Sequence, residues 1–179
     1  MTVSNPKEYS QAGTKAYSSG DYLAAAQHFE AASTGFAAQG DELNAAEMAN
    51  NLSVALLQAG EAQASLEATL GTPAIFEAAN DPRRQAMALG NSAAALDALD
   101  RIEEAEEAYK LCIKLFDQLG EQDLRGNVLQ SLSKLQLRSG RQIEALTTMQ
   151  AGMQDVKRPN IRQRMLKKLL DMPFKLFNR

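Results

Sequence analysis

Apolar residues recur at steps of three and four along most of the chain, which is the spacing of one face of an α-helix. After Gly20 the pattern is carried by Tyr22, Ala25, Phe29 and Ala32. It returns in later segments, for example after Arg101, where the apolar side is made by Ile102, Ala105, Ala108, Tyr109, Cys112, Ile113 and Phe116. These segments predict an all-α protein.

A residue that suits a helix end stands at every twentieth position: Gly20, Gly40, Gly60, Asn80, Asp100, Gly120, Gly140 and Asn160. Gly, Asn and Asp adopt the left-handed conformation of a helix terminus at low cost. The chain is therefore divided into helices of roughly 18 residues joined by very short turns, so that neighbouring helices run antiparallel. A constant repeat of this kind is typical of a solenoid built from helical hairpins.

The segment 61–80 departs from this regular pattern, because Gly71 and Pro73 fall inside it. A proline within a helix removes a hydrogen bond and clashes with the preceding turn, at a cost of about 3 kcal/mol. We expect two short helices or a kink between Leu70 and Ala74. Thr72 is predicted to cap the second helix, with Pro73 as its first residue.

Charge is distributed unevenly along the chain. Residues 157–179 hold eight basic residues and one acid, so this segment carries 8 − 1 = +7 and the rest carries −3 − 7 = −10.

Cys112 is the single cysteine, which excludes an internal disulfide. The chain shows neither a signal peptide nor an apolar run long enough to span a membrane, and we expect a cytoplasmic protein.

The hairpins resemble tetratricopeptide repeats over residues 6–156. The best match is the first repeat, which supplies Tyr9, Ala12, Gly13, Ala16, Gly20, Asp21, Tyr22, Ala25, Phe29 and Ala32. The repeat here is 40 residues, as in the long-helix variety found in kinesin light chains and bacterial regulatory arrays. The resemblance implies a single domain, a right-handed superhelix of four hairpins (6–40, 41–80, 81–120 and 121–158), followed by a capping helix and basic tail at 159–179.

In proteins of this family the first helix of each hairpin lines a concave groove that binds a partner. The resemblance places sixteen residues in that groove: Lys7, Ser10, Gln11, Thr14, Glu47, Asn50, Asn51, Val54, Met87, Gly90, Asn91, Ala94, Asn127, Gln130, Ser131 and Lys134. Amide side chains carry donors and acceptors that suit the backbone of an extended peptide. The peptide-binding candidates are Gln11, Thr14, Glu47, Asn50, Asn51, Asn91, Asn127, Gln130 and Lys134. The alternative is that they are ordinary solvated positions.

No arrangement of residues points to catalysis, a metal or a cofactor. His28 is the single histidine and is expected at the surface, whereas Cys112 falls at a packing position and is expected to be buried. We therefore predict a protein that is not an enzyme and that binds a protein or peptide partner as an adaptor or scaffold.

The basic C-terminal segment leaves a second function open. Its apolar residues Ile161, Met165 and Leu169 are predicted to pack on Ala145, Met149 and Met153 and so to cap the last hairpin. The alternative is a basic amphipathic helix that binds an anionic membrane surface or nucleic acid. Of these two ligands we favour the membrane over nucleic acid. The sequence does not determine the partner, the pathway or the oligomeric state, and a homo-oligomer is left open.

Overall fold

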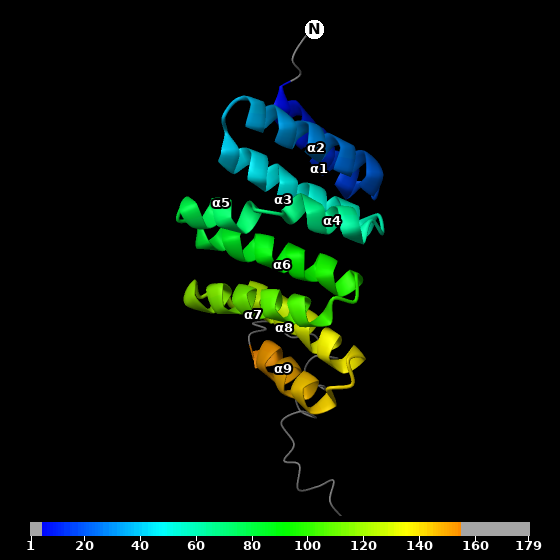
Figure 1. Cartoon of the computed structure of the whole chain (residues 1–179), viewed down its shortest axis with the longest axis vertical. Helices are drawn as coiled ribbons and strands as arrows, with labels where there is room; N and C mark the ends of the chain where they lie inside the picture. The colour runs from blue at the N-terminus through cyan, green and yellow to red at the C-terminus, as the bar shows by residue number, and fades with distance from the viewer. Residues whose placement is uncertain (1–4, 155–179) are drawn as a thin grey trace, which may run out of the picture. The chain divides into compact units, whose positions relative to one another are not determined.

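In the computed structural model, residues 5–154 are described, and every regular element among them is an α-helix (Figure 1). The helices are α1 (Pro6–Ser18), α2 (Tyr22–Ala38), α3 (Glu42–Gln58), α4 (Ala62–Thr69), α5 (Thr72–Ala78), α6 (Pro82–Ala98), α7 (Ile102–Gln118), α8 (Gln122–Arg138) and α9 (Gln142–Gln154). The predicted capping helix, with its cap Asn160, lies outside the described residues.

The chain divides into two compact units, Met1–Leu111 and Cys112–Arg179, and the boundary falls within α7. In the first unit each helix packs on the next along the chain, from α1 to α4, and α6 packs on α3, α4 and α5. In the second unit α8 packs on α9. The predicted all-α fold of consecutive helical hairpins is confirmed.

The turns between these helices repeat one geometry. Gly20 has φ +82°, its N–H donates to the Tyr17 carbonyl at 3.0 Å, and the Asp21 N–H donates to the Ala16 carbonyl at 3.0 Å. These two bonds define a Schellman motif. The same pair of bonds occurs at the turns around residues 40, 60, 80, 100, 120 and 140, where Asn80 and Asp100 also have positive φ. The predicted 20-residue punctuation is therefore confirmed among the described residues.

The residue after each left-handed position begins the next helix. Asp21, Asp41 and Asp81 each accept a hydrogen bond from the backbone N–H three residues later, at 3.2, 3.1 and 2.9 Å respectively. Such an N-cap contributes about 1 kcal/mol. Two adjacent residues thus end one helix and start its antiparallel neighbour, which explains the recurrent Gly-Asp pair.

Small residues lie where the two helices of a hairpin cross. A Cβ added to Gly13 would lie 2.8 Å from the Phe29 ring, and Ala25 of α2 is completely buried. Serines occupy the position of Gly13 in two later hairpins: Ser53 accepts at its carbonyl from the Ser65 hydroxyl at 2.8 Å, and the Ser133 hydroxyl donates to the Ala145 carbonyl at 3.0 Å. The close approach thus leaves these buried hydroxyls satisfied.

The predicted break in the segment 61–80 is confirmed. Leu70 is extended (φ −58°, ψ 123°) and Gly71 is left-handed (φ +79°), which separates α4 from α5. The predicted cap is wrong by one residue, because Gly71 is the N-cap and Thr72 is already helical. The Thr72 hydroxyl lies within hydrogen-bond distance of the Thr69 carbonyl (3.0 Å) and of Asn50 Oδ1 (3.2 Å), so its bonds are to the interior.

Candidate functional site

The predicted groove residues of the first two hairpins line two hollows between α1 and α3. One hollow, of about 180 Å³, is lined by Thr14, Tyr17, Phe29, Asn51 and Val54. The other, of about 310 Å³, is lined by Lys7, Ser10, Gln11, Phe36, Asn44, Glu47 and Met48. The structure therefore brings four of the predicted peptide-binding residues together: Gln11, Thr14, Glu47 and Asn51.

The first hollow combines an apolar floor with two polar groups. Tyr17, Phe29 and Val54 supply the apolar surface. Thr14 donates its hydroxyl hydrogen to the Ser10 carbonyl at 3.0 Å, which leaves the oxygen of that hydroxyl as an acceptor. The Asn51 carboxamide is half-buried and is not engaged by any hydrogen bond among the described residues. This hollow can therefore hold an apolar side chain and hydrogen-bond the backbone beside it.

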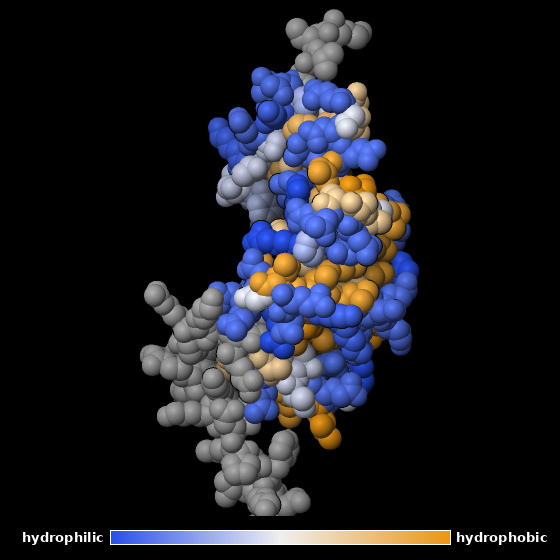
Figure 2. Space-filling model, turned by 90° about the vertical axis from the view of Figure 1, so that its left-hand side faces the viewer, coloured by the Kyte–Doolittle hydropathy of each residue, from blue (hydrophilic) through white to orange (hydrophobic). Residues whose placement is uncertain are grey.

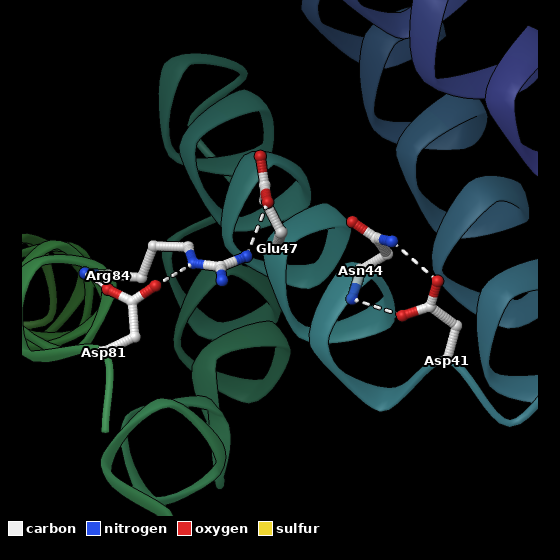
Figure 3. Close-up of polar contacts among 5 residues, drawn as sticks. All are labelled: Asp41, Asn44, Glu47, Asp81 and Arg84. Carbon is white, nitrogen blue, oxygen red and sulfur yellow. Dashed lines mark hydrogen bonds and ion pairs between the residues drawn. The ribbon is translucent and has the colours of Figure 1, made fainter. Parts of the chain in front are cut away.

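The second hollow has a charged wall that connects α3 with α6. Arg84 Nη1 lies 3.0 Å from Glu47 Oε2, and Arg84 Nε lies 2.6 Å from Asp81 Oδ2 (Figure 3). The same guanidinium lies over the Phe76 ring, 5.2 Å from its centroid. The Glu47 carboxylate is therefore held in place at its Oε2 atom by a cation from the following hairpin.

Hydrogen bonds lower the pKa of two capping carboxylates near this hollow. The Arg84 backbone N–H and then its guanidinium lower the pKa of Asp81. The Asn44 side-chain amide, 2.6 Å from Asp41 Oδ2, and then the Asn44 backbone N–H lower the pKa of Asp41 (Figure 3). The positive charge of Lys7 acts on Asp41 in the same direction. The rim of the second hollow thus carries fixed charges of both signs.

Neither Asn44 nor Arg84 was among the predicted site residues. Each stands three residues after a capping aspartate that follows a left-handed turn, and the two positions are 40 residues apart. This repeated spacing from a capping aspartate is the sequence pattern that could have identified both residues. The contact from Arg84 to Glu47 joins different hairpins, and no sequence pattern near either residue indicates it.

Asn50 and Asn91 have different surroundings from Asn51. Asn50 is only 7% exposed, and its Oδ1 lies 3.2 Å from the Thr72 hydroxyl. The half-buried Asn91 donates from Nδ2 to the Asn50 backbone carbonyl at 3.5 Å. A further buried bond joins Ser53 and Ser65 at 3.0 Å, and a part-buried bond runs from Ser92 to Thr69 at 2.9 Å. These side chains form a polar layer that connects α3, α4, α5 and α6 beneath the helix break.

The remaining candidates lie on α8, in the second unit. Asn127 and Lys134 are exposed and Gln130 is half-buried, and steps of three and four place them on one side of the helix. Gly126, Leu129 and Leu132 of the same helix are buried. These three candidates thus form a polar stripe on α8.

The chemistry-bearing residues outside the hollows have structural partners. His28 is half-buried, with its ring centroid 6.2 Å from that of Tyr9. Cys112 is buried, as predicted. The described residues contain no group of three His, Cys, Asp or Glu that could hold a metal ion. None of the helices in the described part is long and apolar enough to cross a membrane.

A scan against protein-family models finds no match, and a search of curated proteins finds no match either. The likeness to tetratricopeptide repeats therefore depends on the residues of the repeat and on the helical hairpins alone.

Proposed function

We propose that this chain is a non-enzymatic interaction module of the tetratricopeptide-repeat type that binds an extended segment of a partner protein between α1 and α3. The observation that supports this proposal is the pair of hollows lined by successive turns of the two helices, with Thr14 and Asn51 in one and Gln11 and Glu47 in the other.

The spacing of the hollows suggests the form of the ligand. Glu47 and Asn51 are one helical turn apart, or about 6 Å along the axis. An extended peptide advances about 3.3 Å per residue and points alternate side chains to the same side, so residues i and i+2 would match the two hollows. The first hollow favours an apolar side chain, and the second favours a polar or charged one.

The test is selection of displayed random peptides on the immobilised full chain, followed by affinity measurement on variants. Asn51→Ala removes the carboxamide and Val54→Glu places a charge on the apolar floor. We expect each to weaken the selected peptides at least about tenfold, which corresponds to about 1.4 kcal/mol. Gln58→Ala is the matched control, because Gln58 is exposed on the same helix and lines neither hollow. Peptides that bind both hollow variants as tightly as the control would refute the proposal.

A cytoplasmic location is part of the proposal and is supported by the single cysteine, which is buried and forms no disulfide within the chain. The alternative function, at an anionic membrane or on nucleic acid, depends on residues 157–179, which lie outside the described residues. It stays a prediction of the sequence.

A further inference from the structure

A third hollow, of about 400 Å³, is formed by α2, α3 and α4 in the first unit. It is lined by Leu23, Ala26, Gln27, Glu30, Leu52, Leu56, Ala64, Glu67 and Ala68. At 100° per residue, Leu52 and Leu56 lie on roughly the opposite side of α3 from Glu47, Asn51 and Val54. This hollow is therefore a different surface from the proposed peptide groove.

The lining of this hollow is mostly apolar, yet it opens to solvent. Leu23 is 59% exposed, although it lines the hollow beside Leu52 and Leu56. Figure 2 shows, on one face of the molecule, that hydrophobic residues reach the surface in patches between hydrophilic ones. An exposed apolar patch with a polar rim is typical of an interaction site.

The stretch of sequence that contains the helices around the hollow holds acidic residues and no basic ones. No Lys or Arg occurs between Lys15 and Arg83, a stretch that includes all of α2, α3 and α4. The same stretch holds nine acids, which are Asp21, Glu30, Asp41, Glu42, Glu47, Glu61, Glu67, Glu77 and Asp81. Two of them, Glu30 and Glu67, line the hollow itself. The occupant that complements this surface presents large apolar side chains next to cations.

The chain's own sequence contains such a segment. Residues 173–179, Pro-Phe-Lys-Leu-Phe-Asn-Arg, interleave Phe174, Leu176 and Phe177 with Lys175 and Arg179. They follow the stretch predicted to cap the last hairpin, so the cap would not use them. Residues 1–111 contain 6 basic and 16 acidic residues, a net charge of 6 − 16 = −10, against +7 for residues 157–179. Between two copies, contact of the basic segment with the acidic unit is attractive, whereas contact between acidic units is repulsive.

We propose that residues 173–179 of a second copy dock in the hollow between α2 and α4. The aromatic and leucine side chains cover Leu23, Leu52 and Leu56, and the cations lie near Glu30 and Glu67. Exchange of the segment in both directions gives a two-fold dimer in which each copy contributes one segment and one hollow. Because a seven-residue contact is small compared with a standard interface, the dimer is weak and sensitive to salt.

Sedimentation velocity on the full chain tests this assembly, between about 1 and 200 µM protein. We expect a monomer–dimer equilibrium at about 50 mM salt that shifts to monomer at about 500 mM. Leu23→Lys places a cation in the hollow and should abolish the dimer. Leu137→Lys is the matched control, because Leu137 is 54% exposed and does not line the hollow, and it should dimerise like wild type. Circular dichroism melting of both variants checks that the fold is intact.

A charge exchange makes the test specific for the segment. Glu30→Lys should weaken dimerisation about tenfold, and Glu30→Lys combined with Lys175→Glu should restore it. A chain that stays monomeric at every concentration would overturn the proposal, including the case in which the segment folds onto its own copy. A Leu23→Lys variant that still dimerises would overturn it too. Asn51→Ala should dimerise normally, so failure of the peptide groove and failure of this contact are distinguishable.

Discussion

The buried polar layer beneath the helix break makes a quantitative prediction for Thr72→Val. Valine keeps the shape of threonine but removes the hydroxyl, whose single hydrogen is shared between the Thr69 carbonyl at 3.0 Å and Asn50 Oδ1 at 3.2 Å. Asn50 is 7% exposed, so water cannot readily replace this bond. A buried acceptor left without a partner costs about 1–3 kcal/mol. For a chain of this size, a loss of about 2 kcal/mol lowers Tm by about 4–8 °C.

A double-mutant cycle separates this hydrogen bond from a general packing defect. Asn50→Leu removes the acceptor, and the double variant Asn50→Leu/Thr72→Val replaces both partners with apolar groups. Replacement of both partners is close to neutral, whereas loss of one is costly, so the double variant should be more stable than the sum of the single effects predicts. We expect a coupling free energy of about 1 kcal/mol or more in denaturant titrations followed by circular dichroism.

The outcome also decides what Asn50 does. If Thr72→Val melts like wild type, or if the two single effects simply add, the carboxamide is not held by this hydroxyl and the interior role assigned to Asn50 is wrong. A third variant, Gln58→Leu, is the control for an amide-to-leucine change at an exposed site of the same helix. Its stability should lie within about 0.5 kcal/mol of wild type.

Two further predictions concern the turns. Gly20→Ala places a Cβ at φ +82° and should lower the free energy of unfolding by about 1–2 kcal/mol, whereas Asn80→Gly, at φ +53°, should be close to neutral. Thermal melting of both variants tests this prediction. Equal melting temperatures for Gly20→Ala and wild type would contradict it. Asp81→Asn tests how the stability depends on pH. Hydrogen bonds lower the pKa of Asp81 in the folded state, so its ionised form stabilises the fold above the unfolded pKa of about 3.9. This contribution is lost as pH falls through the folded pKa. The difference in stability between wild type and Asp81→Asn should therefore be greatest near neutral pH and should disappear in acid; a difference that does not change with pH would show that the carboxylate charge is not the cause.

Much of the fold was predictable, because its signals are local in the sequence. A left-handed glycine and a following aspartate determine a turn through bonds that reach no farther than five residues, such as those of Gly20 and Asp21. Gly71 and Pro73 break a helix for reasons contained in their own backbones. Gly13 and Phe29 stand on either side of the same turn, so the antiparallel hairpin itself brings them together.

The site was predictable only in part, because helical spacing gives the direction of a side chain along one helix but not what lies beyond it. Asn50 and Asn51 are adjacent and chemically identical, yet the break before α5 brings Thr72 to Asn50, while Asn51 lines a hollow. Glu47 meets Arg84, 37 residues later, because the hairpin that contains Arg84 packs on the hairpin that contains Glu47.

The sequence by itself thus determined where helices begin, end and reverse, since those events depend on backbone preferences and bonds within a turn. Only the tertiary structure decided which polar side chains became interior, which line the hollows between α1 and α3, and that an acidic, apolar hollow opens between α2 and α4. The physical reason is that burial and electrostatic surroundings depend on several helices at once. The helices that surround Asn50 or Leu23 are separated in the sequence, and they come together only when the hairpins pack.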